Sequence, residues 1–224
     1  MNLTSTRRFY FRTLPNLFII FGLVFVVISF GPLLISETWF YLKEAKKQDY
    51  SLTVENGVQD SVFARFLSTR PIRIVPVNKD FSIVIERIDV NAPIVADVPV
   101  TDEKAYVEAL KNGIAHAATS QYPSEDAGNV YLFAHASLNF FQLGRYSTAF
   151  NLLRKLDMND RIHIFYRGRT YVYRVVNKEI FHGWNTYPLT RPVVEPILTL
   201  QTCDPPGTTL NRLVVTAKLM EVQD

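Results

Sequence analysis

The hydrophobic positions along the chain divide it into two parts. Residues 13–36 carry no charge and read as an almost continuous apolar run, "LFIIFGLVFVVISFGPLLI". As a helix rising about 1.5 Å per residue, this segment spans roughly 36 Å, which exceeds the roughly 30 Å of a bilayer core. From about Asp80 onward, short apolar runs alternate with polar turns. The pattern predicts one membrane helix followed by a separate folded domain.

Most of the second part has the pattern of short β-strands. The runs "FSIVIERIDV", "NAPIVADV", "NVYLFAHAS", "ILTLQTC" and "NRLVVTAKLMEV" are rich in branched and aromatic residues. The segment "DRIHIFYRGRTYVYRVVNKEIF" alternates on both sides of Arg167-Gly168, which predicts a hairpin. We therefore expect a mainly β domain, an antiparallel barrel or sandwich of about eight strands.

Two segments predict helical structure within this β domain. The clearest helix is "TDEKAYVEALKNG", with Thr101 or Asp102 as its N-cap and Gly113 closing it. The segment "TAFNLLRKLDMND" places apolar residues at helical spacing and predicts a short amphipathic turn or helix.

The apolar run is expected to stay in the membrane as an uncleaved signal anchor. A cleaved signal peptide is the alternative, but the run is long for one, and no A-x-A pattern follows it. An inside N-terminus is favoured by three preceding arginines, Arg7, Arg8 and Arg12. Lysines beyond the run, at 43, 46 and 47, weaken that bias. An aromatic belt is expected at the outer interface, formed by Trp39, Phe40 and Tyr41.

These features predict four parts of the chain. Residues 1–12 form a cytoplasmic tail and residues 13–36 the transmembrane anchor. Residues 37–79, which contain polar stretches and two prolines, form a stem or linker. Residues 80–224 form the extracytoplasmic folded domain.

Composition excludes several classes of function. The chain has 24 basic and 21 acidic residues, and the small excess is scattered, so we expect no nucleic-acid partner. Its single cysteine, Cys203, cannot form an internal disulfide or a cysteine-rich zinc site. No carboxylate cluster has convincing calcium-ligand spacing, and we predict no cofactor.

The surroundings of Cys203 indicate a reactive thiol. If residues 197–203 and 211–221 are successive antiparallel strands, Cys203 and Arg212 face each other across the pair. Asp204 then points to the opposite face. A free cysteine has a pKa near 8.5, so cysteine catalysis needs a cationic or basic neighbour.

Four histidines could provide the base. His135 ends a buried strand beside small residues and is favoured, with a satisfied core histidine as the alternative reading. His116 follows the helix cap, where a structural hydrogen bond is the favoured reading over a catalytic role. His163 is expected on the surface of its strand, and His182 belongs to a loop.

The segment "LTLQTC", followed by an arginine in "RLVV", resembles the T-L-x-T-C…R signature of sortases, which are membrane-anchored cysteine transpeptidases of the bacterial surface. The rest of residues 80–221 is similar in order, including "NVYLFAHAS" as the catalytic-histidine strand and "FNLLRKLDMND" before the hairpin. The chain departs from the family pattern at Ala134, where glycine is common, and at Asn159-Asp160, where Gly-Asp is usual.

The resemblance implies a closed sortase-like barrel and three catalytic residues. Cys203 would be the nucleophile, His135 the general acid and base, and Arg212 the group that stabilises the oxyanion. Substrate contacts are expected from three further residues: Thr202, Ala134 and His116.

The reaction implied by the resemblance is peptide cleavage followed by acyl transfer. The enzyme would cleave a C-terminal sorting signal resembling Leu-Pro-x-Thr-Gly through a thioacyl-enzyme. It would then transfer the surface protein to an amine of a cell-wall precursor or of another surface protein. The lipid bilayer is the remaining expected partner.

A protein-anchoring role is favoured over pilus polymerisation. Residues 37–79 contain no Asp-Pro-aromatic lid motif, and no second apolar span precedes Asp224. Two alternatives remain open from the sequence. One is an L,D-transpeptidase, although Gln201-Thr202 replaces the usual Ser-His-Gly before the cysteine. The other is a catalytically silent, membrane-anchored binding module.

Overall fold

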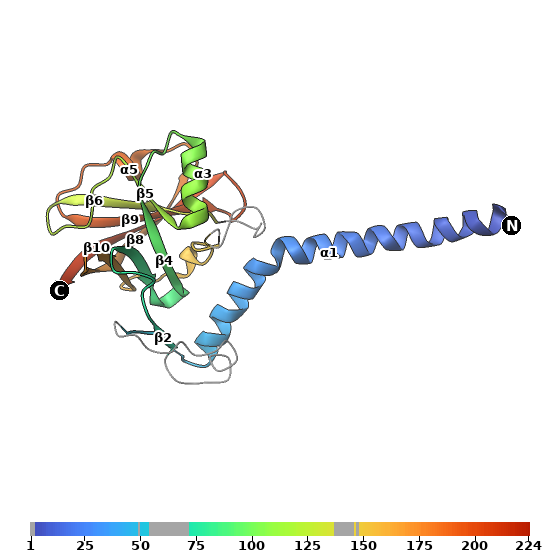
Figure 1. The fold of residues 1–224 in the computed structure, drawn as a ribbon, viewed down its shortest axis with the longest axis horizontal. Coiled ribbons are helices and arrows are strands. Elements are labelled where there is room, and N and C mark those ends of the chain that lie inside the picture. Colours follow the sequence, from blue (N-terminus) through green and yellow to red (C-terminus); the bar gives the residue numbers. More distant parts are fainter. Residues whose placement is uncertain (1–2, 49, 54–71, 137–145, 147) are drawn as a thin grey trace.

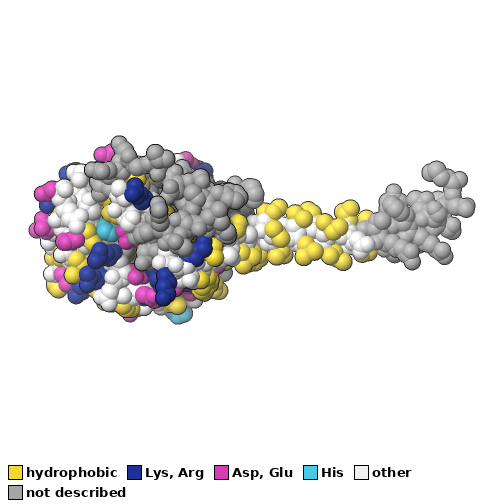
Figure 2. Space-filling view, turned by 90° about the horizontal axis from the view of Figure 1, so that it is seen from below, with side chains coloured by type: hydrophobic (Ala, Val, Ile, Leu, Met, Phe, Trp, Pro, Cys, Tyr) yellow, Lys and Arg dark blue, Asp and Glu magenta, His cyan; other side chains and the backbone are white. Residues whose placement is uncertain are grey.

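A long N-terminal helix and a β-barrel make up the structure (Figure 1). The computed structural model describes residues 3–48, 50–53, 72–136, 146 and 148–224. Helix α1 (Leu3–Ala45) projects away from the barrel, and apolar side chains cover much of the projecting segment seen in Figure 2. Its window Leu14–Gly31 has a mean hydropathy of 2.3, and none of it is buried. Length and composition suit this segment to a membrane anchor or a signal sequence.

The barrel is closed by eight strands in the order β10-β8-β7-β3-β4-β5-β6-β9. The strands are β3 (Phe81–Ile85), β4 (Val90–Val98), β5 (Ile114–Ala117), β6 (Gly128–Phe133), β7 (Arg161–Tyr166), β8 (Arg169–His182), β9 (Pro196–Asp204) and β10 (Asn211–Gln223). The predicted mainly β barrel is confirmed.

Two pairings in the barrel are parallel, β4 with β5 and β6 with β9, and the other six are antiparallel. A parallel pair needs a crossover connection. Helix α3 (Glu103–Asn112) supplies it between β4 and β5. Between β6 and β9 the chain passes through the β7–β8 hairpin and the short helix α5 (Tyr187–Thr190). The β6–β9 pair lies beside the candidate site.

Local sequence signals explain the hairpin and the helix. Arg167 and Gly168 both have positive φ, 51° and 83°, as a type I′ turn between β7 and β8 requires. Asp102 caps α3 by accepting hydrogen bonds from the backbone N–H groups of Lys104 and Ala105, at 3.0 and 3.1 Å. Gly113 follows the last turn. Both predictions from the sequence are confirmed.

The barrel interior is filled by branched side chains from every part of the sheet. Fully buried members include Ile83, Leu132, Ile164, Leu200 and Val215. The segment predicted to be amphipathic contains a short 3₁₀ helix, η2 (Leu153–Lys155). Its three spaced apolar residues are fully buried in the same core: Phe150, Leu153 and Leu156.

One prediction from strand alternation is wrong: His163 is buried, with 8% of its surface exposed. A small parallel sheet, β1 (Tyr50–Leu52) with β2 (Ile72–Ile74), is formed by segments before residue 80. Ile72 and Ile74 pack with Val84 and Phe165 in a second apolar cluster on that side of the barrel. Alternation along β7 separates the two faces of the strand, but it does not show that another segment covers the outer face. Residues 54–71 of the predicted stem lie outside the described residues.

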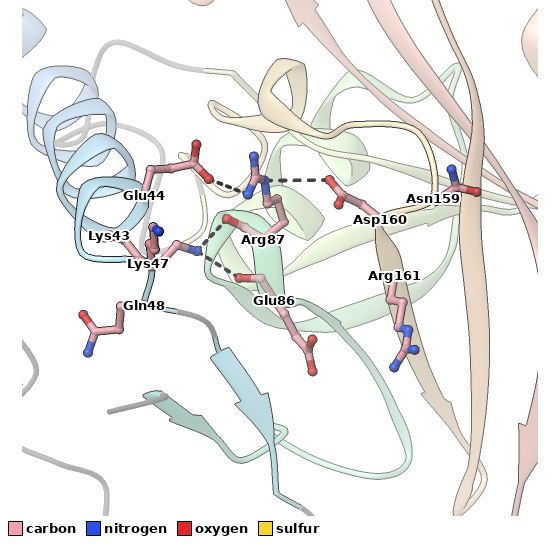
Figure 3. A pocket seen from close by; sticks show the side chains of 9 residues that line it. All are labelled: Lys43, Glu44, Lys47, Gln48, Glu86, Arg87, Asn159, Asp160 and Arg161. Carbon is pink, nitrogen blue, oxygen red and sulfur yellow. Dashed lines mark hydrogen bonds and ion pairs between the residues drawn. The ribbon is translucent and has the colours of Figure 1, made fainter. Parts of the chain in front are cut away.

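The C-terminal end of α1 is fixed to the barrel. Phe40 is 5% exposed and belongs to the main core cluster. The Lys43 ammonium donates hydrogen bonds to the backbone carbonyls of Glu86 and Arg87, at 3.3 and 2.7 Å. Glu44 pairs with the Arg87 guanidinium, which also faces Asp160 (Figure 3). The residues that make these contacts line a polar cavity of about 590 Å³ and hold α1 against the domain.

Candidate active site

The pairing of β6, β9 and β10 brings three candidate catalytic residues to one edge of the barrel. Arg212 on β10 lies directly opposite Cys203 on β9, as predicted from the sequence. Phe133 on β6 pairs with Gln201 on β9, and these two strands run in the same direction, side by side in Figure 1. Two residues beyond that pair, His135 comes level with Cys203. His135, Cys203 and Arg212 therefore form one row across neighbouring segments.

Hydrogen bonds extend the register of β6 and β9 beyond the last paired strand residues. The backbone N–H of Ala134 donates to the carbonyl of Gln201 at 3.1 Å. The Thr202 hydroxyl donates to the carbonyl of Ala134 at 3.0 Å, and Thr202 is only 3% exposed. The residues immediately before His135 and Cys203 are thus joined directly. This contact fixes the spacing of the two backbones that carry the histidine and the thiol.

Alternation along the strands sets which side chains face the site. Leu200 points into the core, so Gln201 and Cys203 share the outer face of β9. Tyr131 and Phe133 lie on the corresponding face of β6. A cavity of about 610 Å³ covers this surface, and all four residues line it together with His135 and Arg212. The Tyr131 hydroxyl donates a hydrogen bond to the Gln201 side chain within it.

The thiol and the imidazole have environments suited to acyl transfer. Cys203 is a free cysteine and is partly exposed, so a substrate can reach it. Burial lowers the pKa of His135, which favours the neutral imidazole at pH 7. Within the described part of the chain, the Nε2 atom of His135 is buried without a hydrogen-bond partner. A neutral imidazole of this kind can accept a proton from a thiol and later release it.

The guanidinium of Arg212 is held by the turn before β10. Its Nη1 atom donates to the carbonyls of Thr209 and Asn211, at 3.3 and 3.2 Å. Gly183 packs closely against the same turn. A Cβ at that position would lie 2.4 Å from the Thr209 carbonyl oxygen and 3.6 Å from Nη1 of Arg212. The close approach of these two loops therefore requires glycine at position 183.

The three residues expected to contact substrate are not among those that line this cavity. Thr202 and Ala134 are buried and bonded to each other. His116 is fully buried, and its Nε2 lies 3.0 Å from both the Gln121 carbonyl and the Ser120 hydroxyl. Burial lowers the pKa of His116, despite the nearby Asp97 carboxylate.

Several cavity residues were not identified from the sequence. Tyr106 comes from the predicted helix α3, where its spacing gives no sign that it faces the cysteine. Trp184 lies in the loop after β8, is 81% exposed and stacks on His182 with ring centroids 5.1 Å apart. The only sequence signal for Trp184 is a large aromatic residue in a polar loop.

In the residues that the structure describes, no group of three or more His, Cys, Asp or Glu side chains could hold a metal ion.

Comparisons with solved structures find proteins that are similar in fold. The chain is similar to sortase C-1 from Actinomyces oris, with 26% identity, a TM-score of 0.52, and coverage of 65% of this chain and 76% of that one. Sortase E1 from Streptomyces coelicolor, solved with a tripeptide in its active site, has 21% identity, a TM-score of 0.53 and coverage of 65% and 90%. Sortase C from Clostridium perfringens, solved with the C-terminal cell wall sorting motif, has 23% identity, a TM-score of 0.52 and coverage of 64% and 72%.

No curated protein sequence matches the chain. The family model described as "Sortase domain" matches residues 83–220, which is more than half of the chain. The matched region runs from within β3 to within β10 and includes His135, Cys203 and Arg212. The chain therefore belongs to the sortase family, whose members are cysteine transpeptidases.

Proposed function

We propose that this protein cleaves a C-terminal Leu-Pro-x-Thr-Gly-like sorting signal and transfers the new carboxyl end to an amine. The observation that carries the proposal is the row of His135, Cys203 and Arg212 along one edge of the barrel, beside one cavity. A thiol, a neutral imidazole and a fixed cation are the groups that acyl transfer through a thioester requires.

In the first step, His135 takes the proton of the Cys203 thiol, and the sulfur attacks the threonyl carbonyl carbon. The carbonyl oxygen becomes an oxyanion, which the Arg212 guanidinium stabilises. As the tetrahedral intermediate collapses, the bond from carbon to the glycine nitrogen breaks. His135 gives its proton to the departing amine, and the threonyl group remains on Cys203 as a thioester.

In the second step, an acceptor amine attacks the thioester carbonyl. His135 takes the proton that the amine loses, a new amide forms, and the Cys203 sulfur leaves. We propose an amine of a cell-wall precursor or of another surface protein as the acceptor. The sorting motif bound by the Clostridium perfringens sortase C supports the proposed class of donor substrate.

We also propose that the enzyme works on the outer side of the membrane and attaches proteins to the cell surface. We propose that residues 13–36 anchor the protein with residues 1–12 inside, because arginines precede the apolar run. Residues 37–79 would connect the anchor to an extracytoplasmic catalytic domain at 80–224. Because residues 37–79 contain no Asp-Pro-aromatic tripeptide, we favour anchoring of proteins over pilus polymerisation.

A transfer assay tests the proposal. The full chain in detergent micelles is mixed with a library of Leu-Pro-x-Thr-Gly-like peptides and triglycine, and the products are identified by mass spectrometry. We expect a product in which the peptide, cut after threonine, is joined to triglycine. Cys203→Ala should abolish this product, while the surface variant Lys218→Ala should retain it. A Cys203→Ala protein with full transfer activity would exclude the proposed nucleophile.

A further inference from the structure

Tyr106 lies between the core and the row of proposed catalytic residues. It is carried by α3, in the crossover between β4 and β5, and it lines the same cavity as Cys203. On one side, its ring stacks on Phe133, with centroids 5.1 Å apart and planes 10° apart. On another side, it meets His135 edge to face, with centroids 5.8 Å apart and planes at 82°. Both arrangements are preferred geometries for neighbouring aromatic rings.

The orientation of the His135 imidazole depends on packing. In catalytic triads, a carboxylate or amide commonly fixes the histidine ring through a hydrogen bond. Within the described residues, Nε2 of His135 is buried and has no such partner. In the described part of the chain, the ring of Tyr106 packs against His135. Tyr106 can therefore restrict rotation of the imidazole.

Tyr106 is itself well fixed. Phe133 lies on the outer face of β6 but belongs to the main apolar cluster and is only 4% exposed, so the surface on which Tyr106 stacks does not move freely. Burial raises the pKa of Tyr106 to about 12, an effect to which the charge of Cys203 adds and which Arg212 opposes. The phenol therefore stays neutral at pH 7 and brings no second charge to the row.

We propose that Tyr106 is a positioning residue. Its ring stacks on the buried Phe133 and thereby holds the imidazole of His135 in one orientation. This inference rests on the proposed role of His135 as the acid and base. The ring should matter and the hydroxyl should not. Tyr106→Phe should keep the arrangement, whereas Tyr106→Leu should free the imidazole and let water reach it.

The first measurement is transfer kinetics of the full chain. We expect Tyr106→Leu to lower kcat by on the order of 10- to 100-fold with KM changed less than threefold, because a misplaced base slows the chemistry more than binding. Tyr106→Phe should stay within about threefold of the parent protein. Tyr106→Met, flexible and without a flat ring, replaces Tyr106→Leu if the latter does not fold.

The second measurement is the pKa of His135, which can be determined without catalytic turnover. The imidazole of His135 is titrated by NMR in the full chain carrying Cys203→Ala, and its signal is assigned by its loss in His135→Gln. The other ionisable groups lining the cavity are Glu103, Tyr106, Tyr131 and Arg212. Burial now lowers the pKa of His135, so Tyr106→Leu should raise it toward the ordinary value, while Tyr106→Phe should leave it in place.

Tyr122 provides a matched control, because its ring also packs on a histidine, His116, at 4.7 Å, and it does not line the cavity. Tyr122→Leu should leave both kcat and the His135 titration unchanged. A folded Tyr106→Leu protein with the parent kcat and the parent titration of His135 would overturn the inference. Failure of the proposed function looks different, because transfer would then survive in His135→Gln or Cys203→Ala.

Discussion

Cys203 and Arg212 lie directly opposite each other in the antiparallel pair of β9 and β10, so the strand register itself places a cation beside the thiol. Hydrogen bonds from Nη1 to the carbonyls of Thr209 and Asn211 hold the guanidinium at the start of its strand. A cation fixed before the reaction can stabilise a developing oxyanion without reorganising.

Removing that cation should impair the chemical step. We expect Arg212→Ala to lower kcat for peptide transfer by roughly 10²–10³, by analogy with oxyanion-hole donors. The measurement is steady-state transfer kinetics of the full chain. Lys218→Ala is the matched control, since Lys218 lies on the same strand and pairs with Glu195 at 2.7 Å on the surface. Equal kinetics of the two variants would argue against a catalytic role for Arg212.

The bond between Thr202 and Ala134 should hold His135 at the level of Cys203. Thr202→Val keeps the shape but removes the hydroxyl that donates to the Ala134 carbonyl. We expect a loss of about 1 kcal/mol in the free energy of unfolding. We also expect kcat to fall about tenfold, because the imidazole is less well placed. Thr202→Ser should restore both values. If Thr202→Val loses stability but keeps kcat, the bond has only a structural role.

Gly183 should be required for the placement of Arg212. In Gly183→Ala, the new methyl group would meet the Thr209 carbonyl at 2.4 Å, so the turn that holds the guanidinium must move. We expect kcat/KM to fall by at least about tenfold and the thermal midpoint to fall as well. Gly22→Ala is the control, because a Cβ there has no neighbour within 4 Å. A Gly183→Ala protein with normal kinetics would show that the two loops adjust without moving Arg212.

His163 should make the fold sensitive to acid. Burial, helped by the charge of Arg161 and opposed by that of Glu221, lowers the pKa of His163 to about 4 in the folded protein, even with the Glu86 carboxylate 3.8 Å from the ring. An unfolded histidine titrates near 6.5. Above about pH 6.5 the ring is neutral in both states and costs no stability. As the pH falls toward 4, the unfolded state binds a proton that the folded state does not, and the free energy of unfolding decreases by on the order of 3 kcal/mol. His163→Phe should therefore flatten the fall of the thermal midpoint between these pH values.

The control for this experiment is His182→Phe, because His182 is exposed at the end of β8 and does not lie in a loop as predicted from the sequence. That variant should keep the acid sensitivity of the parent protein. Burial also lowers the pKa of His116, and partial burial lowers that of His135, so a part of the sensitivity should remain in His163→Phe. If the two variants lose stability equally as the pH falls, protonation of His163 does not limit folding.

Much of the site could be predicted from local patterns. The relation of Cys203 to Arg212 depends only on two successive strands and one turn, which the sequence makes visible. The caps of α3 and the turn at Arg167-Gly168 are equally local, and the structure confirms them.

Long-range packing accounts for the rest. His135 lies level with Cys203 because β6 and β9, which are far apart in the sequence, pair in parallel. The sequence pattern predicted antiparallel pairs only. His163 is buried on the same face of β7 as Phe165, and Phe165 packs with Ile72 and Ile74. Strand alternation in β7 does not reveal that a segment from before residue 80 covers this face. Tyr106 reaches the site because α3 crosses over the barrel.

The central claim is that Cys203 carries the acyl group between the two substrates. The most direct measurement is the intact mass of the full chain after mixing with a Leu-Pro-x-Thr-Gly-like peptide at low pH and without an acceptor amine. The account predicts a mass gain equal to that of the peptide ending at its threonine, less one water. Fragmentation should locate this adduct on Cys203, and hydroxylamine should remove it. Cleavage of the peptide with no adduct on Cys203, or with the adduct on another residue, would contradict it.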